Sequence, residues 1–149
     1  MKIEAEILSV PAGNTFNIIE ATNVHACPNR RGYNYKITSY ITFRKPEGIM
    51  ESIYLIEDII ILNPFNKESI EAITPKYKKQ VSSYIRERLQ GIGFDDEDYR
   101  FYILSDKEEL PHAPFRENVL NQRYFTFDEL RSGNKHVRTV NELKKELEK

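Results

Sequence analysis

Two consecutive strand patterns joined by a tight turn place the strongest constraint on how this chain can fold. Residues 35–45 alternate between two faces, one of which carries Tyr35, Ile37, Ser39, Ile41 and Phe43. Pro46-Glu47-Gly48 is typical of a hairpin turn. Residues 50–62 then begin in alternation and end in the continuous apolar run 59–62. We expect that run to be covered on both faces of a sheet.

Three further segments of the first hundred residues can be assigned from turn signals and periodicity. A strand is expected at residues 15–21, because apolar residues follow the turn signal Pro11-Ala12-Gly13-Asn14. Residues 24–32 contain Pro, Asn and Gly and are expected to form a loop. Residues 99–104 are rich in aromatic and aliphatic side chains and predict another strand.

One long helix is predicted over residues 75–90. Thr74-Pro75 is a common helix start, and the glycines at 91 and 93 favour its end. Its apolar face carries Tyr77, Val81, Tyr84, Ile85 and Leu89. We expect this face to pack on the sheet.

The last third of the chain contains two capping-box patterns. Thr126 and Glu129 predict one helix start, and Thr139 and Glu142 predict another. The first helix must be short, because Ser132-Gly133-Asn134 closes it. The second is expected at about residues 139–148.

The order of these elements predicts an α+β fold. A chain of 149 residues suits one domain, here residues 1–149 with a barrel core at about 15–132. We expect a strongly bent, mainly antiparallel open β-barrel with one main helix and short flanking helices.

Composition excludes several classes of protein. The longest apolar run is four residues, far below the ~20 that a membrane helix requires, and acidic residues at the N-terminus do not suit a signal peptide. One cysteine, Cys27, excludes an internal disulfide. We therefore expect a soluble cytoplasmic protein. The net charge of −1 argues against a broad nucleic-acid-coating surface, although residues 30–45 hold five basic residues and no acid.

No catalytic or metal-binding constellation stands out. His25 and Cys27 could form a pair, but no third group with a fixed role is visible, and a buried cysteine beside a loop histidine is the simpler interpretation. The other histidines lack metal-ligand spacing, and the glycines do not form a phosphate loop before a helix. We expect no catalytic residue, no metal and no cofactor.

Tyrosines and phenylalanines beside arginines form the best candidate site. Ring faces and guanidinium groups hold flat, anionic ligands, of which nucleotides are the leading example. Arg123 and Tyr124 directly precede the Thr126 capping box, where helix amides favour an anion. The ligand-binding residues predicted are Tyr35, Tyr40, Arg44, Tyr102, Arg123 and Tyr124. The alternative is that these tyrosines are core residues and the arginines are surface charges.

The element order and the closing phrase Arg-Tyr-Phe-Thr-Phe-Asp-Glu-Leu at 123–130 resemble the PUA-like superfamily, especially its EVE and YTH branches. The resemblance covers roughly residues 15–132. It implies a curled barrel that binds RNA or DNA, commonly by holding one modified base in an aromatic cage, and in bacteria often beside defence nucleases. The chain has no tryptophan, from which the YTH cage is largely built, and it lacks the Gly-x-Lys-x-x-Glu-x-Arg phrase of the ASCH branch.

These observations predict non-catalytic recognition of nucleic acid or a nucleotide, with a flipped, single-stranded or modified base preferred. The alternative is a small interaction or regulatory module whose C-terminal helix binds a protein partner or a second copy. That helix shows Val140, Leu143 and Leu147 as a narrow apolar stripe.

Overall fold

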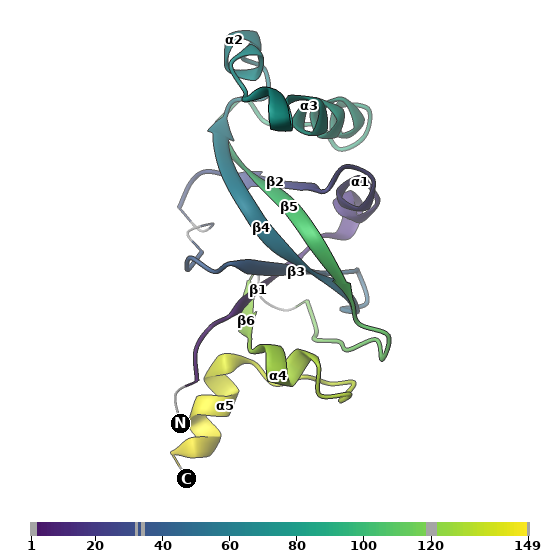
Figure 1. Cartoon of the computed structure of the whole chain (residues 1–149), viewed down its shortest axis with the longest axis vertical. Helices are drawn as coiled ribbons and strands as arrows, with labels where there is room; N and C mark the ends of the chain where they lie inside the picture. The colour runs from purple at the N-terminus through teal and green to yellow at the C-terminus, as the bar shows by residue number, and fades with distance from the viewer. Residues whose placement is uncertain (1–2, 32, 34, 119–121, 149) are drawn as a thin grey trace. The chain divides into compact units, whose positions relative to one another are not determined.

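The structure, a computed structural model, describes residues 3–31, 33, 35–118 and 122–148, and its elements are labelled in Figure 1. The strands are β1 (Ile7–Pro11), β2 (Val24–Pro28), β3 (Tyr40–Arg44), β4 (Met50–Leu62), β5 (Tyr99–Glu109) and β6 (Arg123–Phe125). The helices are α1 (Phe16–Thr22), α2 (Lys67–Glu71), α3 (Pro75–Leu89), α4 (Phe127–Leu130) and α5 (Val140–Leu147), with a 3-10 turn at Gly13–Thr15.

The strands form a mixed six-stranded sheet in the order β2-β5-β4-β3-β1-β6. The pairs β1–β6, β2–β5 and β3–β4 are antiparallel, whereas β1 and β3 run parallel. The sheet is open, with β2 and β6 as its edge strands. The expected fold class, α+β with an open, mainly antiparallel barrel-like sheet, one main helix and short flanking helices, is confirmed.

The chain forms two compact units. Unit 1 comprises Met1–Gly13, Tyr35–Leu55 and Asp106–Lys149. Unit 2 comprises Asn14–Asn34 and Ile56–Ser105. Strands β4 and β5 each contribute residues to both units.

The core of unit 1 gathers apolar side chains from β1, β4, β6, α4 and the segments that flank them. Its fully buried members are Ile7, Met50, Ile53, Leu110, Phe125, Leu130 and Val137. Strand β3 is buried on both faces, since Ile41 and Phe43 on one side and Thr42 and Arg44 on the other are all at most 2% exposed. The predicted strand at 35–45 is longer than β3, which spans Tyr40–Arg44.

The turn between β3 and β4 lies against a distant segment of unit 1. Gly48 closes the turn by donating its N–H to the Lys45 carbonyl, and it has a φ of +93°, which glycine adopts without strain. The Arg116 N–H donates to the Gly48 carbonyl at 3.1 Å. A Cβ at position 48 would overlap the Arg116 carbonyl group. The predicted turn is confirmed, and the glycine is required by this close approach.

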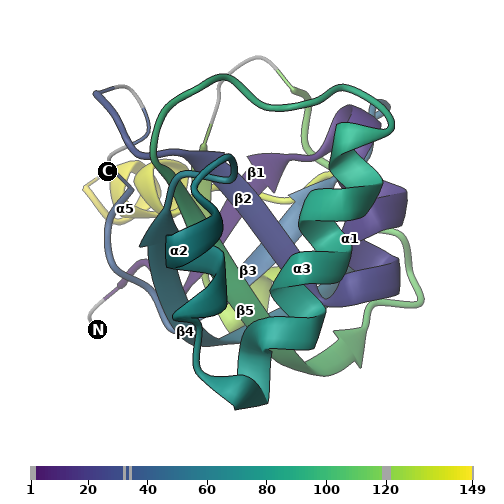
Figure 2. The same cartoon turned by 90° about the horizontal axis from the view of Figure 1, so that it is seen from above.

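The core of unit 2 is built around α3, which lies beside α1 (Figure 2). The predicted helix is confirmed at Pro75–Leu89, and Val81, Tyr84 and Ile85 on its apolar face are at most 5% exposed. Leu89, which was expected on the same face, is 46% exposed. The buried stripe therefore ends one turn earlier than the sequence pattern.

Three other expectations for unit 2 are wrong. Residues 16–22 form α1 rather than a strand. Asn23 ends this helix in a left-handed conformation and donates its N–H to the Ile19 carbonyl. Residues 24–28 form β2 rather than a loop, because they pair with β5 and bury His25 and Cys27. The apolar run at the end of β4 is covered on one face only. Ile59 and Ile61 share the other face and are about half exposed.

Candidate functional site

A pocket of about 240 Å³ lies within unit 1 and is formed by four separate segments. The segment before β1, the segment before β3, strand β6 and the start of α5 each contribute to its wall. Its lining residues are Ala5, Lys36, Gln122, Arg123, Tyr124, Thr139, Val140 and Asn141. Two of these side chains are cationic and none is acidic.

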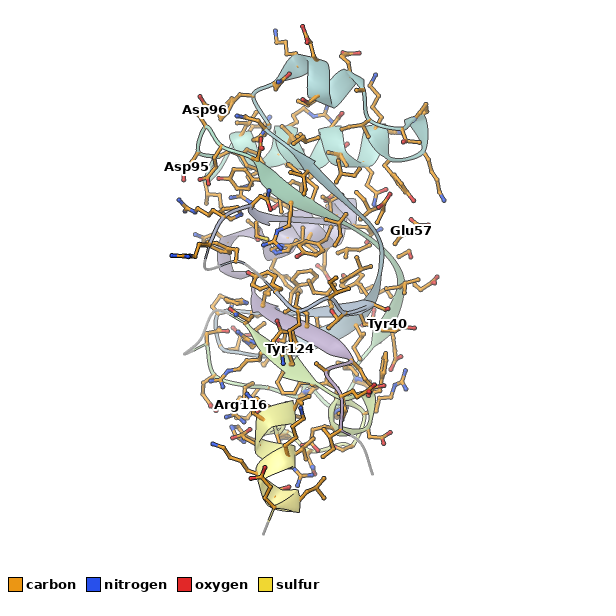
Figure 3. All side chains as sticks on the ribbon, turned by 90° about the vertical axis from the view of Figure 1, so that its left-hand side faces the viewer. Tyr40, Glu57, Asp95, Asp96, Arg116 and Tyr124 are labelled. Atoms are coloured by element: carbon orange, nitrogen blue, oxygen red, sulfur yellow. The ribbon has the colours of Figure 1, made fainter. Side chains whose placement is uncertain are left out.

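Tyr124 fixes Lys36 at this pocket. Antiparallel pairing of β6 with β1 places Tyr124 opposite Leu8, and Tyr124 can be followed in Figure 3. The Tyr124 hydroxyl accepts a hydrogen bond from the Lys36 backbone N–H at 2.7 Å. The Lys36 ammonium lies 5.5 Å from the centroid of the Tyr124 ring. One tyrosine thus anchors both the backbone and the charge of the lysine.

Arg123 brings a second cation to the pocket. Its register opposite Ser9 in β1 fixes the backbone from which the side chain reaches the pocket. The Arg123 Nε atom is buried and has no hydrogen-bond partner among the described residues.

The first turn of α5 forms another part of the wall. Thr139 and Glu142 make a complete capping box, in which the Thr139 Oγ1 accepts from the Glu142 N–H and the Glu142 carboxylate accepts from the Thr139 N–H. Val140 and Asn141 are the first two residues of the helix, and amides at these positions have no acceptor within a helix. The positive end of the α5 dipole therefore adds to the two side-chain charges.

Glu142, a carboxylate in the first turn of α5, is paired in a salt bridge. Arg116 donates two hydrogen bonds to Glu142, at 2.6 and 2.9 Å. These bonds, together with those from Thr139, lower the pKa of Glu142 to about 2. The acid thus caps the helix and pairs with an arginine, and it is not among the residues that line the pocket.

A third arginine lies beneath this region in the buried face of β3. The Arg44 guanidinium donates to the Ser9 carbonyl at 3.1 Å, to the Ser9 hydroxyl at 2.9 Å and to the Asn118 side chain at 2.9 Å. Burial, followed by the charges of Arg123 and Arg116, lowers the pKa of Arg44 to about 10. Arg44 is therefore a structural cation whose charge interacts with that of Arg123 in the pocket.

The structure brings some of the six predicted site residues together and separates others. Arg123 and Tyr124 line the pocket, and Arg44 interacts electrostatically with Arg123 and with Tyr35. Tyr40 packs edge-to-face on Phe127, with 4.6 Å between ring centroids, against the unit 1 core. Tyr102 lies in unit 2, is 3% exposed and stacks on His25.

Sequence reasoning missed Lys36, Gln122 and the start of α5. The Thr139 capping box marks that helix start in the sequence, but Arg123 was associated with the nearer helix at Thr126. In the structure, the pocket that Arg123 lines includes the later helix start. Strand pairing brings Arg123 and the start of α5 to the same pocket, and no local sequence pattern predicts that proximity.

Other candidate chemistry has a structural explanation or is not seen. His25 is buried in β2, and desolvation followed by the charge of Arg88 lowers its pKa to about 3, so the ring is neutral. Across the described ranges, no three His, Cys, Asp or Glu side chains are grouped so as to hold a metal ion. None of the helices described here combines the length and apolar character needed to cross a bilayer.

Comparison with known proteins gives a likeness at the level of solved structures. No family model matches the sequence, and no curated protein is detectably similar to it. The crystal structure of ASCH from Zymomonas mobilis is 12% identical, with a TM-score of 0.48 over 87% of this chain and 94% of that chain. A Ser-to-Ala variant of the same protein gives 11% identity and a TM-score of 0.48 over 88% and 96% of the two chains. The expected membership of the PUA-like superfamily, and of its EVE or YTH branch, stays a prediction.

Proposed function

We propose that the protein recognises a nucleotide or nucleic acid, without catalysis, through the unit 1 pocket. The observation that carries the proposal is the lining itself. Arg123, Lys36 and the Tyr124 ring share one small pocket, and no carboxylate is among the residues that line it.

Each part of the pocket has a role in this proposal. A phosphate group binds between the Arg123 guanidinium and the Lys36 ammonium, near the free amides at the start of α5. The Tyr124 ring supplies the aromatic surface against which a base packs, and such stacking is worth about 1–3 kcal/mol per base. Arg44 and Tyr35 belong to the surroundings of this site rather than to its lining, and Tyr40 packs against the unit 1 core.

The charge of the chain narrows the form of nucleic acid expected. A net charge of −1 gives little general attraction to a duplex, so binding should depend on this local site. A base inside a duplex cannot reach a pocket, which favours a single-stranded, flipped or modified base. A role beside bacterial defence nucleases stays a prediction from the resemblance.

The test is a titration of the full chain with single-stranded and duplex oligonucleotides, plain and base-modified, at two salt concentrations. We expect single strands to bind more tightly than duplexes, and binding to weaken as salt rises. Arg123→Met should reduce affinity by about tenfold, the loss of one charge-assisted contact. Arg86→Met is the matched control, because Arg86 is an exposed arginine in unit 2 that does not line the pocket. Equal losses in the two variants, or no binding to any oligonucleotide or nucleotide at low salt, would contradict the proposal.

One observation favours the alternative function, an interaction module that uses α5. Val140 is 3% exposed and belongs to the core, but Leu147 at the other end of the stripe is 58% exposed. Leu147→Glu tests this surface without changing the pocket lining. Loss of a homodimer or of a bound protein partner, with oligonucleotide binding intact, would favour the interaction module.

A further inference from the structure

We infer that the unit 1 pocket takes a terminal phosphate monoester, on a strand end or a free nucleotide, in preference to an internal phosphodiester. This inference rests on the proposed function and names the ligand class of the same site. It follows from the charge of the lining, the charges around it and the volume of the pocket.

The charge of the lining suits a dianion. Arg123 and Lys36 contribute two positive charges, and the amides of Val140 and Asn141 add the positive end of a helix. An internal phosphodiester carries one negative charge, whereas a terminal phosphate carries about −1.5 to −2 at pH 7. The terminal group therefore matches the charge of the lining more closely.

Two carboxylates beside the start of α5 are both paired with arginines, Glu142 with Arg116 and Glu129 with Arg138. The carboxylate of Glu142 is engaged by two hydrogen bonds from Arg116 and by the capping box. Arg44 lies close enough to Arg123 for the two charges to oppose each other. A dianion in the pocket would relieve that repulsion and would pair with the charge of Arg123.

The volume of the pocket also favours a terminal phosphate over an internal phosphodiester. At about 240 Å³ it is smaller than the roughly 300–1,000 Å³ typical of pockets that enclose a whole drug-sized ligand. A phosphate with part of its attached nucleotide can be enclosed there. A continuous strand, which must both enter and leave the site, is accommodated less well.

The experiment compares four oligonucleotides of one sequence in the same titration of the full chain. They carry a 5′-phosphate, a 3′-phosphate, hydroxyls at both ends, or a 5′-methylphosphate, which retains the phosphorus but only one negative charge. We expect the better phosphorylated form to bind about tenfold more tightly than the hydroxyl and methylphosphate forms. Competition by a nucleoside monophosphate and by inorganic phosphate distinguishes a free nucleotide from a strand end as the source of the group, and either result supports the inference.

Two pocket variants connect the preference to the site. Arg123→Met and Lys36→Met should each remove most of the preference for the phosphorylated form, and Arg123→Lys should retain part of it. Arg86→Met should leave it intact, and a thermal unfolding curve of each variant shows that it is folded. A preference that survives both methionine variants would overturn the inference. Equal binding of all four oligonucleotides, lost in Arg123→Met, would overturn the inference while leaving the proposed function standing, and no binding at all would overturn both.

Discussion

Arg88 of unit 2 and Arg123 of unit 1 differ in whether the described residues supply an acceptor for the guanidinium Nε. In unit 2, the Arg88 guanidinium lies 4.4 Å from the centroid of Phe94 and 5.3 Å from that of Tyr99. It donates to the Ala26 carbonyl at 3.2 Å and to the Tyr84 hydroxyl at 3.0 Å, and its Nε donates to the Gly93 carbonyl at 2.9 Å. Arg88 is a core residue despite its charge.

In unit 1, Arg123 lies beside Tyr124 in β6 and lines a pocket instead of joining the core. Its Nε is as inaccessible as a core atom but has no acceptor among the residues that the structure describes. An arginine is therefore a structural cation in unit 2 and a candidate binding cation in unit 1. The distinction lies in backbone carbonyls and hydroxyls that only the folded chain brings near.

Replacing Arg88 should have the largest effect on stability. Arg88→Met keeps the aliphatic stem but leaves the Ala26 and Gly93 carbonyls without this donor, and we expect the free energy of unfolding to fall by about 3–5 kcal/mol. Urea denaturation measures this change. Arg86→Met on the exposed face of α3 is the control and should change stability by no more than about 0.5 kcal/mol. A loss below about 1 kcal/mol for Arg88→Met would show that the contacts of Arg88 contribute little to stability, as is expected for Arg123.

The second effect comes from His25, which packs in unit 2 beside Tyr102. Its folded pKa of about 3 lies below the unfolded value of 6.5, so only the unfolded chain takes up this proton as pH falls. Stability should therefore fall below pH 6.5, by about 1.4 kcal/mol per pH unit. Unfolding free energies measured between pH 7 and pH 5 should show a shallower slope in His25→Phe, which keeps a ring against Tyr102. Identical slopes would contradict a buried neutral imidazole.

The third effect concerns the salt bridge beside the pocket. Glutamine can still complete a capping box, so Glu142→Gln removes only the charge that pairs with Arg116. We expect the free energy of unfolding to fall by only about 1 kcal/mol at pH 7, because the Glu142 side chain is 43% exposed. The folded pKa of Glu142 is depressed, so its contribution is present above pH 4.5 and is lost as pH falls to about 2. The difference between variant and parent should narrow over that range. A constant difference would assign the loss to packing instead of charge.

The smallest effect on stability is expected for Arg123, and this prediction tests most directly whether Arg123 differs from Arg88. Arg123→Met removes no hydrogen bond of its Nε with the described chain, so the free energy of unfolding should change by no more than about 0.5 kcal/mol. Differential scanning calorimetry in the absence of ligand measures this. Destabilisation above about 1 kcal/mol would show that Arg123, like Arg88, is held by the fold.

Local signals in the sequence predicted the elements that local interactions determine. The capping box at Thr139, the proline start of α3 and the turn at Gly48 all appear where they were expected. Strand β2 was missed because the Pro, Asn and Gly residues of 24–32 indicate a loop, and only pairing with β5 explains the burial of His25 and Cys27.

The candidate site could be predicted only in part, for the same reason. Arg123 and Tyr124 were identified from composition, but Lys36 and the start of α5 join them through contacts between segments far apart in the chain. The parallel pairing of β1 with β3 and the antiparallel pairing of β1 with β6 bring these segments together. No periodicity within one segment carries that information.

Gly48 shows how such contacts would mislead a screen of single substitutions. Every other residue type would add a Cβ where the Arg116 carbonyl already lies, and would displace the segment from which Arg116 reaches Glu142 at the start of α5. A library selected only for ligand capture would therefore keep glycine at position 48 as strictly as it keeps arginine at position 123. Such a selection would not distinguish the two positions. Arg123 contributes a cation to the ligand, whereas Gly48 only leaves space for the backbone of the Arg116 segment.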